Sequence, residues 1–121
     1  EIDALVFAAR AAGIRVGILS NELELFYGNQ FLAGMHFLKD LDVIIDATHT
    51  GILKPDPRAY QLAIDALRLP PESILFVDDQ FRNIAGAVNV GLQTQYFDLR
   101  DVPGNIAAVA ARLGLAPRTH T

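Results

Sequence analysis

Apolar residues along this chain recur in two spacings, one typical of helices and one typical of short buried strands. Helical spacing covers residues 2–12, ending at Gly13, and returns at 57–67, 81–90 and 103–113. Residues 22–38 have the same spacing but contain Gly28 and Gly34, which predicts two short helices. Short apolar runs predict strands at 16–19, 43–45 and 73–77, and QTQYF at 93–97 is interpreted as a fourth strand. The turn-forming residues 48–56 predict a loop.

The boundaries of the helix at 57–67 are marked by the residues at its ends. Asp56 suits an N-cap and Pro57 the first helical position, whereas Pro70 and Pro71 end the segment. The inward-facing positions of this helix are expected to be Tyr60, Ala63, Ile64 and Leu67. In the next helix, Ile84, Ala87 and Val88 are expected to point inward.

Strands that alternate with helices predict an α/β fold with a Rossmann-like parallel sheet and helices on both faces, in three layers. In such folds, binding sites lie beyond the carboxyl ends of the strands. Ser20 and Asn21 follow the first strand, Lys54 follows the second, and Asp78 and Asp79 follow the third. We therefore expect these residues, which are far apart in the sequence, to meet at one edge of the sheet.

Composition narrows the class of protein. The 121 residues are 51% hydrophobic and 20% charged, which is typical of one globular domain. A net charge of −4 excludes the basic surface of a nucleic-acid-binding protein. The chain has no cysteine, so disulfides and zinc–cysteine sites are excluded, and we expect a cytoplasmic protein. No apolar run approaches the ~18 residues of a membrane span.

The adjacent carboxylates of Asp78 and Asp79 need compensation. At an effective dielectric constant of ~20, two carboxylates ~5 Å apart repel by about 3 kcal/mol. A divalent cation such as Mg²⁺ and the ammonium of Lys54 would both offset this repulsion. Ser20 and the backbone of Asn21 can donate hydrogen bonds to phosphoryl oxygens. Together these groups predict a site for a phosphoryl group and a metal ion.

Three motifs in order, ILSN, GILKPDP and FVDD, resemble motifs two to four of the haloacid dehalogenase-like (HAD) hydrolase superfamily, in its branch with a helical cap. The resemblance covers residues 1 to about 100. It implies that Ser20 and Asn21 bind the phosphoryl group and that Lys54 bridges this group and the nucleophile. It also implies that Asp79 binds Mg²⁺ with Asp78 in support. Asn83 stands where many members have a second acid, and we expect its amide to hydrogen-bond Lys54 or the loop.

The first motif of the superfamily, a nucleophilic Asp followed two residues later by an acid–base Asp, has no counterpart here. Asp42 and Asp46 have the wrong spacing and order. The family's first, central strand and most of its cap are also absent, so residues 1–114 are expected to form a partial core domain and 115–121 a tail. In the family that strand lies between those carrying Ser20 and Asp78, so its absence predicts a gap in the sheet.

We expect the missing segment upstream of Glu1 or lost by proteolysis, so that an N-terminal segment or another chain, as in a homodimer, completes the sheet. The resemblance implies a Mg²⁺-dependent phosphatase of a small phosphorylated metabolite, acting through an aspartyl-phosphate on an Asp outside this chain. By itself the chain is expected to be inactive. The alternatives are a 2-haloacid dehalogenase, a phosphomutase, or a non-catalytic binding domain of the same superfamily.

Overall fold

The computed structural model describes residues 2–21 and 41–115. Their elements, in chain order, are α1 (Ile2–Ala11), β1 (Gly17–Ser20), β2 (Val43–Asp46), α3 (Ala47–Thr50), α4 (Pro57–Leu67), the 3₁₀ turn η2 (Pro71–Ser73), β3 (Leu75–Asp78), α5 (Phe81–Asn89), β4 (Gln93–Tyr96), the 3₁₀ turn η3 (Leu99–Asp101) and α6 (Val102–Arg112). The expected helices at 22–38 and the tail after residue 115 lie outside the described residues. None of the described helices is long and apolar enough to cross a membrane.

The strands form two separate parallel pairs. β1 pairs with β2, with Ser20 opposite Asp46, and β3 pairs with β4, with Asp78 opposite Tyr96. No ladder of hydrogen bonds joins β1 to β3 among the four described strands. The parallel α/β fold predicted from the sequence is confirmed, and within residues 2–21 and 41–115 the sheet has the expected gap.

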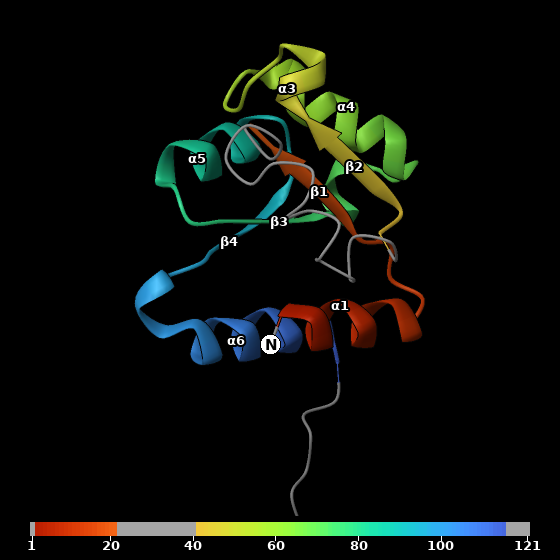
Figure 1. Ribbon diagram of the computed structural model, residues 1–121, viewed down its shortest axis with the longest axis vertical. Coiled ribbons are helices and arrows are strands. Elements are labelled where there is room, and N and C mark those ends of the chain that lie inside the picture. The colour runs from red at the N-terminus through yellow and green to blue at the C-terminus, as the bar shows by residue number, and fades with distance from the viewer. Residues whose placement is uncertain (1, 22–40, 116–121) are drawn as a thin grey trace, which may run out of the picture.

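Helices cover both faces of these strands, which gives three layers (Figure 1). On one face, α4 packs against β1 and β2, while α5 packs against β3 and β4. On the other face, α1 and α6 lie side by side, although they are at opposite ends of the chain. The first and last helices therefore close the same side of the molecule.

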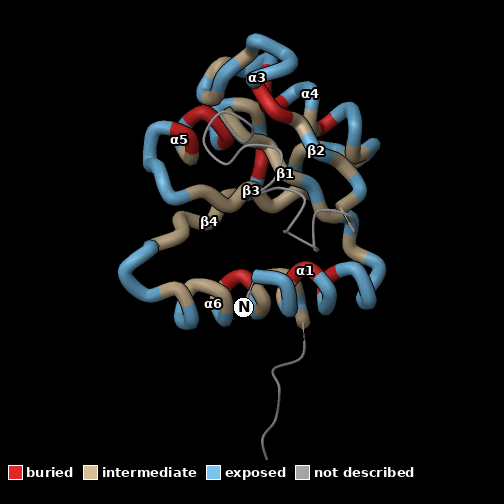
Figure 2. The backbone as a smooth tube through the Cα atoms, in the orientation of Figure 1, coloured by how far each residue is buried: buried red, intermediate tan, exposed pale blue. Residues whose placement is uncertain are grey.

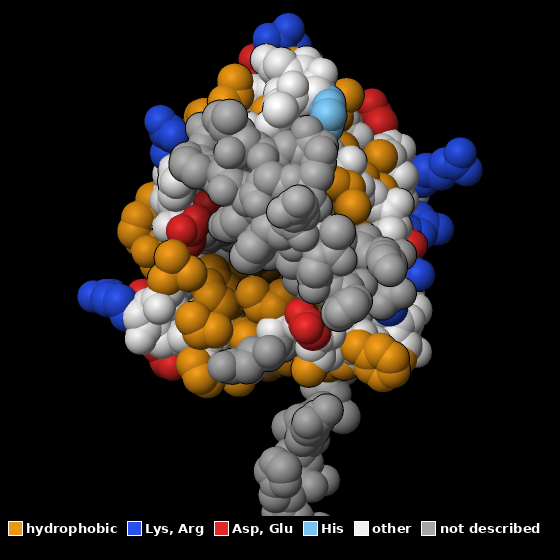
Figure 3. All heavy atoms as spheres, in the orientation of Figure 1, with side chains coloured by type: hydrophobic (Ala, Val, Ile, Leu, Met, Phe, Trp, Pro, Cys, Tyr) orange, Lys and Arg blue, Asp and Glu red, His pale blue; other side chains and the backbone are white. Residues whose placement is uncertain are grey.

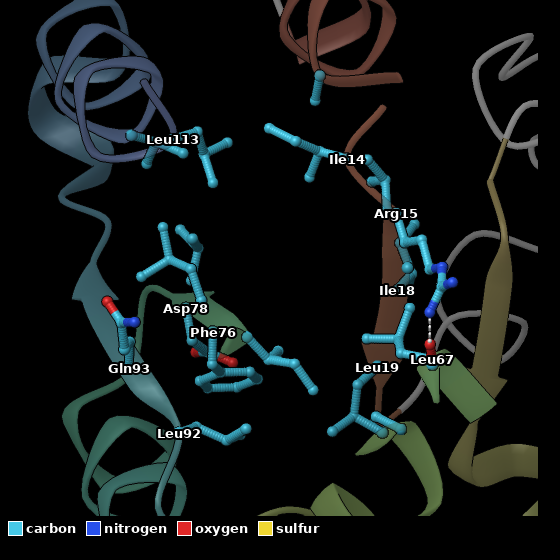
Figure 4. Close-up of a pocket in the computed structure, with 18 of the residues that line it drawn as sticks. Ile14, Arg15, Ile18, Leu19, Leu67, Phe76, Asp78, Leu92, Gln93 and Leu113 are labelled. Atoms are coloured by element: carbon cyan, nitrogen blue, oxygen red, sulfur yellow. Dashed lines mark hydrogen bonds between the residues drawn. The ribbon is translucent and has the colours of Figure 1, made fainter. Parts of the chain in front are cut away.

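A slot of about 940 Å³ separates the two pairs of strands, and we call it the inter-sheet slot. Ile18 and Leu19 of β1 line one wall, and Phe76 of β3 lines the opposite wall, with Leu113 from the α6 side (Figure 4). Hydrophobic side chains also gather on the face of the molecule between the strands and the α1–α6 pair (Figure 3). The lining is thus mainly apolar, as the interior of a parallel sheet is.

The packed core lies beside the slot, between α4, α5 and the strands. Tyr60, Ile64, Ala87 and Leu92 form it. Figure 2 shows buried stretches of α5 in this region, and others in α1, in α6 and near α3. Within the described part of the chain, Tyr60 is the only large side chain that is fully buried. The slot explains this small core, because it occupies the centre where large side chains would otherwise meet.

The structure differs from two expectations. The helical turn α3 occupies most of what the sequence predicts as the start of a loop, since Asp46 Oδ1 accepts a hydrogen bond from Thr48 N and Gly51 ends the turn at φ 72°. The inward orientation expected for Val88 is wrong, because its exposed fraction is 56%. The buried face of α5 instead contains the small or polar residues Asn83, Gly86 and Ala87.

Candidate active site

The carboxyl ends of β1 and β3 face each other across one end of the inter-sheet slot. Ser20 is the last residue of β1 and Asp78 the last residue of β3. Lys54, in the loop between α3 and α4, lines the slot together with Asp78 and Asp79. The residues that the sequence singles out therefore lie at one edge, as expected from parallel strand order.

Lys54 and Asp78 form a buried ion pair at the centre of this edge. Lys54 Nζ lies 2.8 Å from Asp78 Oδ2, and the exposed fractions of the two side chains are 9% and 7%. The ammonium also lies 5.4 Å from the centroid of the Phe76 ring, within the range of a cation–π contact. Burying either charge alone would be costly, so each charged group stabilises its partner in this buried position.

The other oxygen of Asp78 is fixed by its own loop. Asp78 Oδ1 accepts a hydrogen bond of 2.8 Å from Gln80 N. Asn83 Nδ2 donates to both carboxylate oxygens of Asp78, at 3.3 and 3.4 Å. The expectation that Asn83 bonds to Lys54 or the loop is wrong, since α5 directs its amide to the carboxylate that already pairs with Lys54. Asn83 is 3% exposed, and its Oδ1 is buried without a hydrogen-bond partner.

Asn21 holds the backbone of Lys54 at two points. Its Oδ1 accepts a hydrogen bond of 2.7 Å from Lys54 N, and its Nδ2 donates one of 3.2 Å to Lys54 O. The sequence places Asn21 beside Ser20 as a phosphoryl-binding residue. In the structure its side chain joins the end of β1 to the loop that carries Lys54.

Tyr60 contacts two residues that lie against the ion pair, Asn83 and Phe76. Its hydroxyl donates a hydrogen bond of 2.7 Å to the carbonyl of Asn83, and its ring meets Phe76 edge to face, with centroids 5.4 Å apart. Burial, assisted by the negative charge of Asp78, raises the pKa of Tyr60 to about 12. This hydroxyl therefore stays protonated as a hydrogen-bond donor at neutral pH.

Asp79 differs from its neighbour. It is exposed, and its carboxylate has no hydrogen bond or ion pair with the described residues. No group of three acids or histidines within residues 2–21 and 41–115 could enclose a metal ion. Mg²⁺, however, usually takes one or two protein carboxylates and completes its shell with water and phosphate oxygens. Asp79 fits such a site as an available oxygen ligand, and Asp78, whose oxygens are already hydrogen-bonded, fits a supporting role.

The model of one protein family, described as haloacid dehalogenase-like hydrolase, matches residues 1–91. The chain belongs to this family. The members to which it is similar include a phosphatase and a haloacid dehalogenase. It is 37% identical to Phosphatase MT3486 of Mycobacterium tuberculosis over 74% of this chain and 42% of that protein. It is also 37% identical to (S)-2-haloacid dehalogenase 1 of a Pseudomonas species, over 72% of this chain and 38% of the relative.

A longer relative and several solved structures extend this comparison. Acyl-CoA dehydrogenase family member 10 of the mouse is 36% identical over 70% of this chain and 8% of its own length. The structure of an uncharacterized protein from Corynebacterium glutamicum superposes with a TM-score of 0.81 at 27% identity, covering 97% of this chain and 83% of that one. A HAD phosphatase from Thermococcus onnurineus shares the fold, with a TM-score of 0.76 at 21% identity over 92% and 55% of the two chains. The chain spans less than half the length of the three curated relatives named here.

Two residues that support this haloacid dehalogenase-like site are not evident as such from the sequence. Tyr60 is counted there only as part of an apolar stripe, and Gly86 only as a helix residue. A β-carbon on Gly86 would lie 2.7 Å from Tyr60 Oη and 2.8 Å from Pro55 Cβ. The glycine in the middle of NIAGAV is the signal, since helix interiors disfavour glycine unless another group approaches closely.

Proposed function

We propose that the whole protein is a Mg²⁺-dependent phosphatase that hydrolyses a small phosphorylated metabolite through an aspartyl-phosphate intermediate. The observation that carries this proposal is the buried pair of Lys54 and Asp78, at 2.8 Å, next to the available carboxylate of Asp79. A cationic donor and a carboxylate at the same edge match the needs of phosphoryl transfer, in which positioning and charge stabilisation dominate.

Each residue has a role in this proposal. Ser20 and the backbone of Asn21 donate hydrogen bonds to phosphoryl oxygens, while Lys54 contributes its positive charge to the phosphoryl group and the attacking carboxylate. Asp79 holds Mg²⁺ and Asp78 supports it indirectly by fixing Lys54. When bound, the metal ion neutralises charge on the phosphoryl oxygens. A neutral Asn83 beside Asp78 avoids a further negative charge in this buried region.

The nucleophile comes from outside this chain in the proposed mechanism. Among the described strands, none pairs with the edges that β1 and β3 present to the inter-sheet slot, and both edges end at the candidate site. A parallel strand in the slot would satisfy these backbone groups and would deliver its last residue beside Lys54. An N-terminal segment of the whole protein, from the same copy or from the other copy of a homodimer, is the proposed source of this strand and of its nucleophilic aspartate.

Three rival functions differ from this proposal in their chemistry. A 2-haloacid dehalogenase, favoured by the similarity to (S)-2-haloacid dehalogenase 1, would use a carboxylate nucleophile without a metal ion. The intact pair Asp78–Asp79 favours the metal and therefore the phosphatase. A phosphomutase would use the same metal site but return the phosphoryl group to its substrate, and a non-catalytic binding domain would have no nucleophilic aspartate in the whole protein.

The test compares two substrates in the whole protein. We expect 4-nitrophenyl phosphate to be hydrolysed with Mg²⁺ and not after chelation, and 2-chloropropionate to release no chloride. Equal phosphatase turnover after complete chelation would contradict the metal requirement. Chloride release without phosphate release would favour the dehalogenase. Asp65→Ala, which removes an exposed acid on α4, is a control variant. It should leave the rates of phosphate release and chloride release unchanged.

A further inference from the structure

Both ends of the Asn21 side-chain amide are engaged by the protein itself. Oδ1 accepts from Lys54 N at 2.7 Å and Nδ2 donates to Lys54 O at 3.2 Å, so both ends of the amide contact the same residue. The orientation of the amide follows from chemistry, because the backbone N–H needs an acceptor and the carbonyl needs a donor. This two-point contact imitates the pairing of two adjacent strands.

The contact spans a region where the two pairs of strands share no ladder. Asn21 directly follows β1, whereas Lys54 Nζ reaches 2.8 Å to Asp78 at the end of β3. Lys54 is therefore held by its backbone to one pair of strands and by its ammonium to the other. Without Asn21, the described contacts would hold the Lys54 side chain at Asp78 but would leave its backbone without this link to β1.

We propose that the side chain of Asn21 is a positioning group, which acts on the reaction through Lys54 and does not itself bind the substrate. This inference rests on the proposed phosphatase function for its kinetic consequences, although the backbone contact can be tested independently. In the transition state, a small displacement of Lys54 Nζ weakens its interaction with the developing charge. A residue acting in this way should affect kcat more than KM.

The kinetic test is a double-mutant cycle in the whole protein, with 4-nitrophenyl phosphate as the substrate. We expect Asn21→Ala to lower kcat by about tenfold or more and to change KM by less than about twofold. In a Lys54→Ala background, the same substitution should lower kcat by less than about twofold, because the group that Asn21 positions is already gone. An equal loss of kcat in both backgrounds, or a loss confined to KM, would overturn the proposal and favour direct contact with substrate.

Amide hydrogen exchange tests the contact without any reaction. In Asn21→Ala, we expect the backbone amide of Lys54 to exchange about tenfold faster or more, since its acceptor is Asn21 Oδ1. The amide of Gln93, which donates to Ile74 O at 3.0 Å beside the other pair of strands, should be unchanged. Unchanged exchange at Lys54 would overturn the proposal. If Lys54→Ala has no measurable turnover, the kinetic cycle cannot be completed, and the exchange measurement alone tests the proposal.

Two further variants separate this proposal from its alternatives. Asn21→Asp keeps the acceptor for Lys54 N but loses the donor to Lys54 O, so its exchange rate at Lys54 should lie between those of the wild type and Asn21→Ala. Asn89→Ala, at an exposed position at the end of α5, is the matched control and should change neither kcat nor exchange at Lys54. A wild-type protein with no phosphatase activity would refute the proposed function, while exchange would still decide whether Asn21 positions Lys54.

Discussion

Gly86 is the point where α5 comes closest to the elements that support the site, and replacing it by alanine tests this packing. The added β-carbon would lie 2.7 Å from Tyr60 Oη, 2.8 Å from Pro55 Cβ and 3.1 Å from Tyr60 Cε2. Tyr60 is fully buried and hydrogen-bonded to Asn83 O, and the ring of Pro55 is rigid. Neither neighbour can move aside easily, so α5 itself must shift.

Two opposing contributions determine the change in the free energy of unfolding. Overpacking a core position costs about 1–3 kcal/mol, and the two fixed neighbours place Gly86→Ala at about 3 kcal/mol. Alanine is better than glycine in a helix interior by about 1 kcal/mol. We therefore expect a net loss of about 2 kcal/mol. Because Pro55 follows Lys54 in the chain, we also expect a lower kcat.

Urea denaturation of the whole protein measures this loss. The matched control is Ala85→Gly, an exposed position one residue earlier in α5, where only helix propensity changes and about 1 kcal/mol should be lost. If Gly86→Ala instead gained about 1 kcal/mol, as the reverse of this control, the close approach of α5 to Tyr60 and Pro55 would be refuted.

Three other variants test the ion pair, the metal ligand and the buried hydroxyl. Lys54→Met leaves the carboxylate of Asp78 buried without its cation, so we expect turnover to be abolished and the free energy of unfolding in urea to fall by about 3 kcal/mol; wild-type stability would contradict the buried pair. Asp79→Ala should abolish Mg²⁺-dependent turnover and leave the urea midpoint unchanged, since Asp79 is exposed, and wild-type kinetics would exclude it as the metal ligand. The unfolded chain releases the Tyr60 proton near pH 10 and the folded protein at about 12, so stability should be intact below pH 10 and fall by at most about 2 kcal/mol as the pH rises to 12. This fall should be absent in Tyr60→Phe, and an equal fall in that variant would show that another group causes it.

The regular elements of the fold could be predicted from local patterns. The apolar run before Asp78 and the Asp56–Pro57 start signal each gave an element within a few residues of its observed bounds. The turn α3 was missed because its formation depends on a cap from Asp46 and a left-handed Gly51 rather than on periodicity. The orientation of Val88 was predicted wrongly because hydrophobicity alone did not reveal that α5 packs through its smallest residues.

The residues of the candidate site could be predicted from the sequence, but the hydrogen bonds among them could not. Parallel strand order brought Ser20, Lys54 and Asp78 to one edge, and this consequence of topology could be foreseen. Which polar group pairs with which depends on tertiary distances of a few ångströms. Asn21 bonds to Lys54 and Asn83 bonds to Asp78, and no spacing in the sequence indicates either contact.

The gap between β1 and β3 couples the shape of the site to the contents of the inter-sheet slot. Neighbouring strands in a sheet lie about 4.8 Å apart, so a strand placed between β1 and β3 would fix their separation at about twice that distance. The same separation determines whether Lys54 can reach Asp78 while Asn21 holds its backbone. Binding of such a strand and binding of an anion at Lys54 would then be thermodynamically linked, each strengthening the other by the same factor.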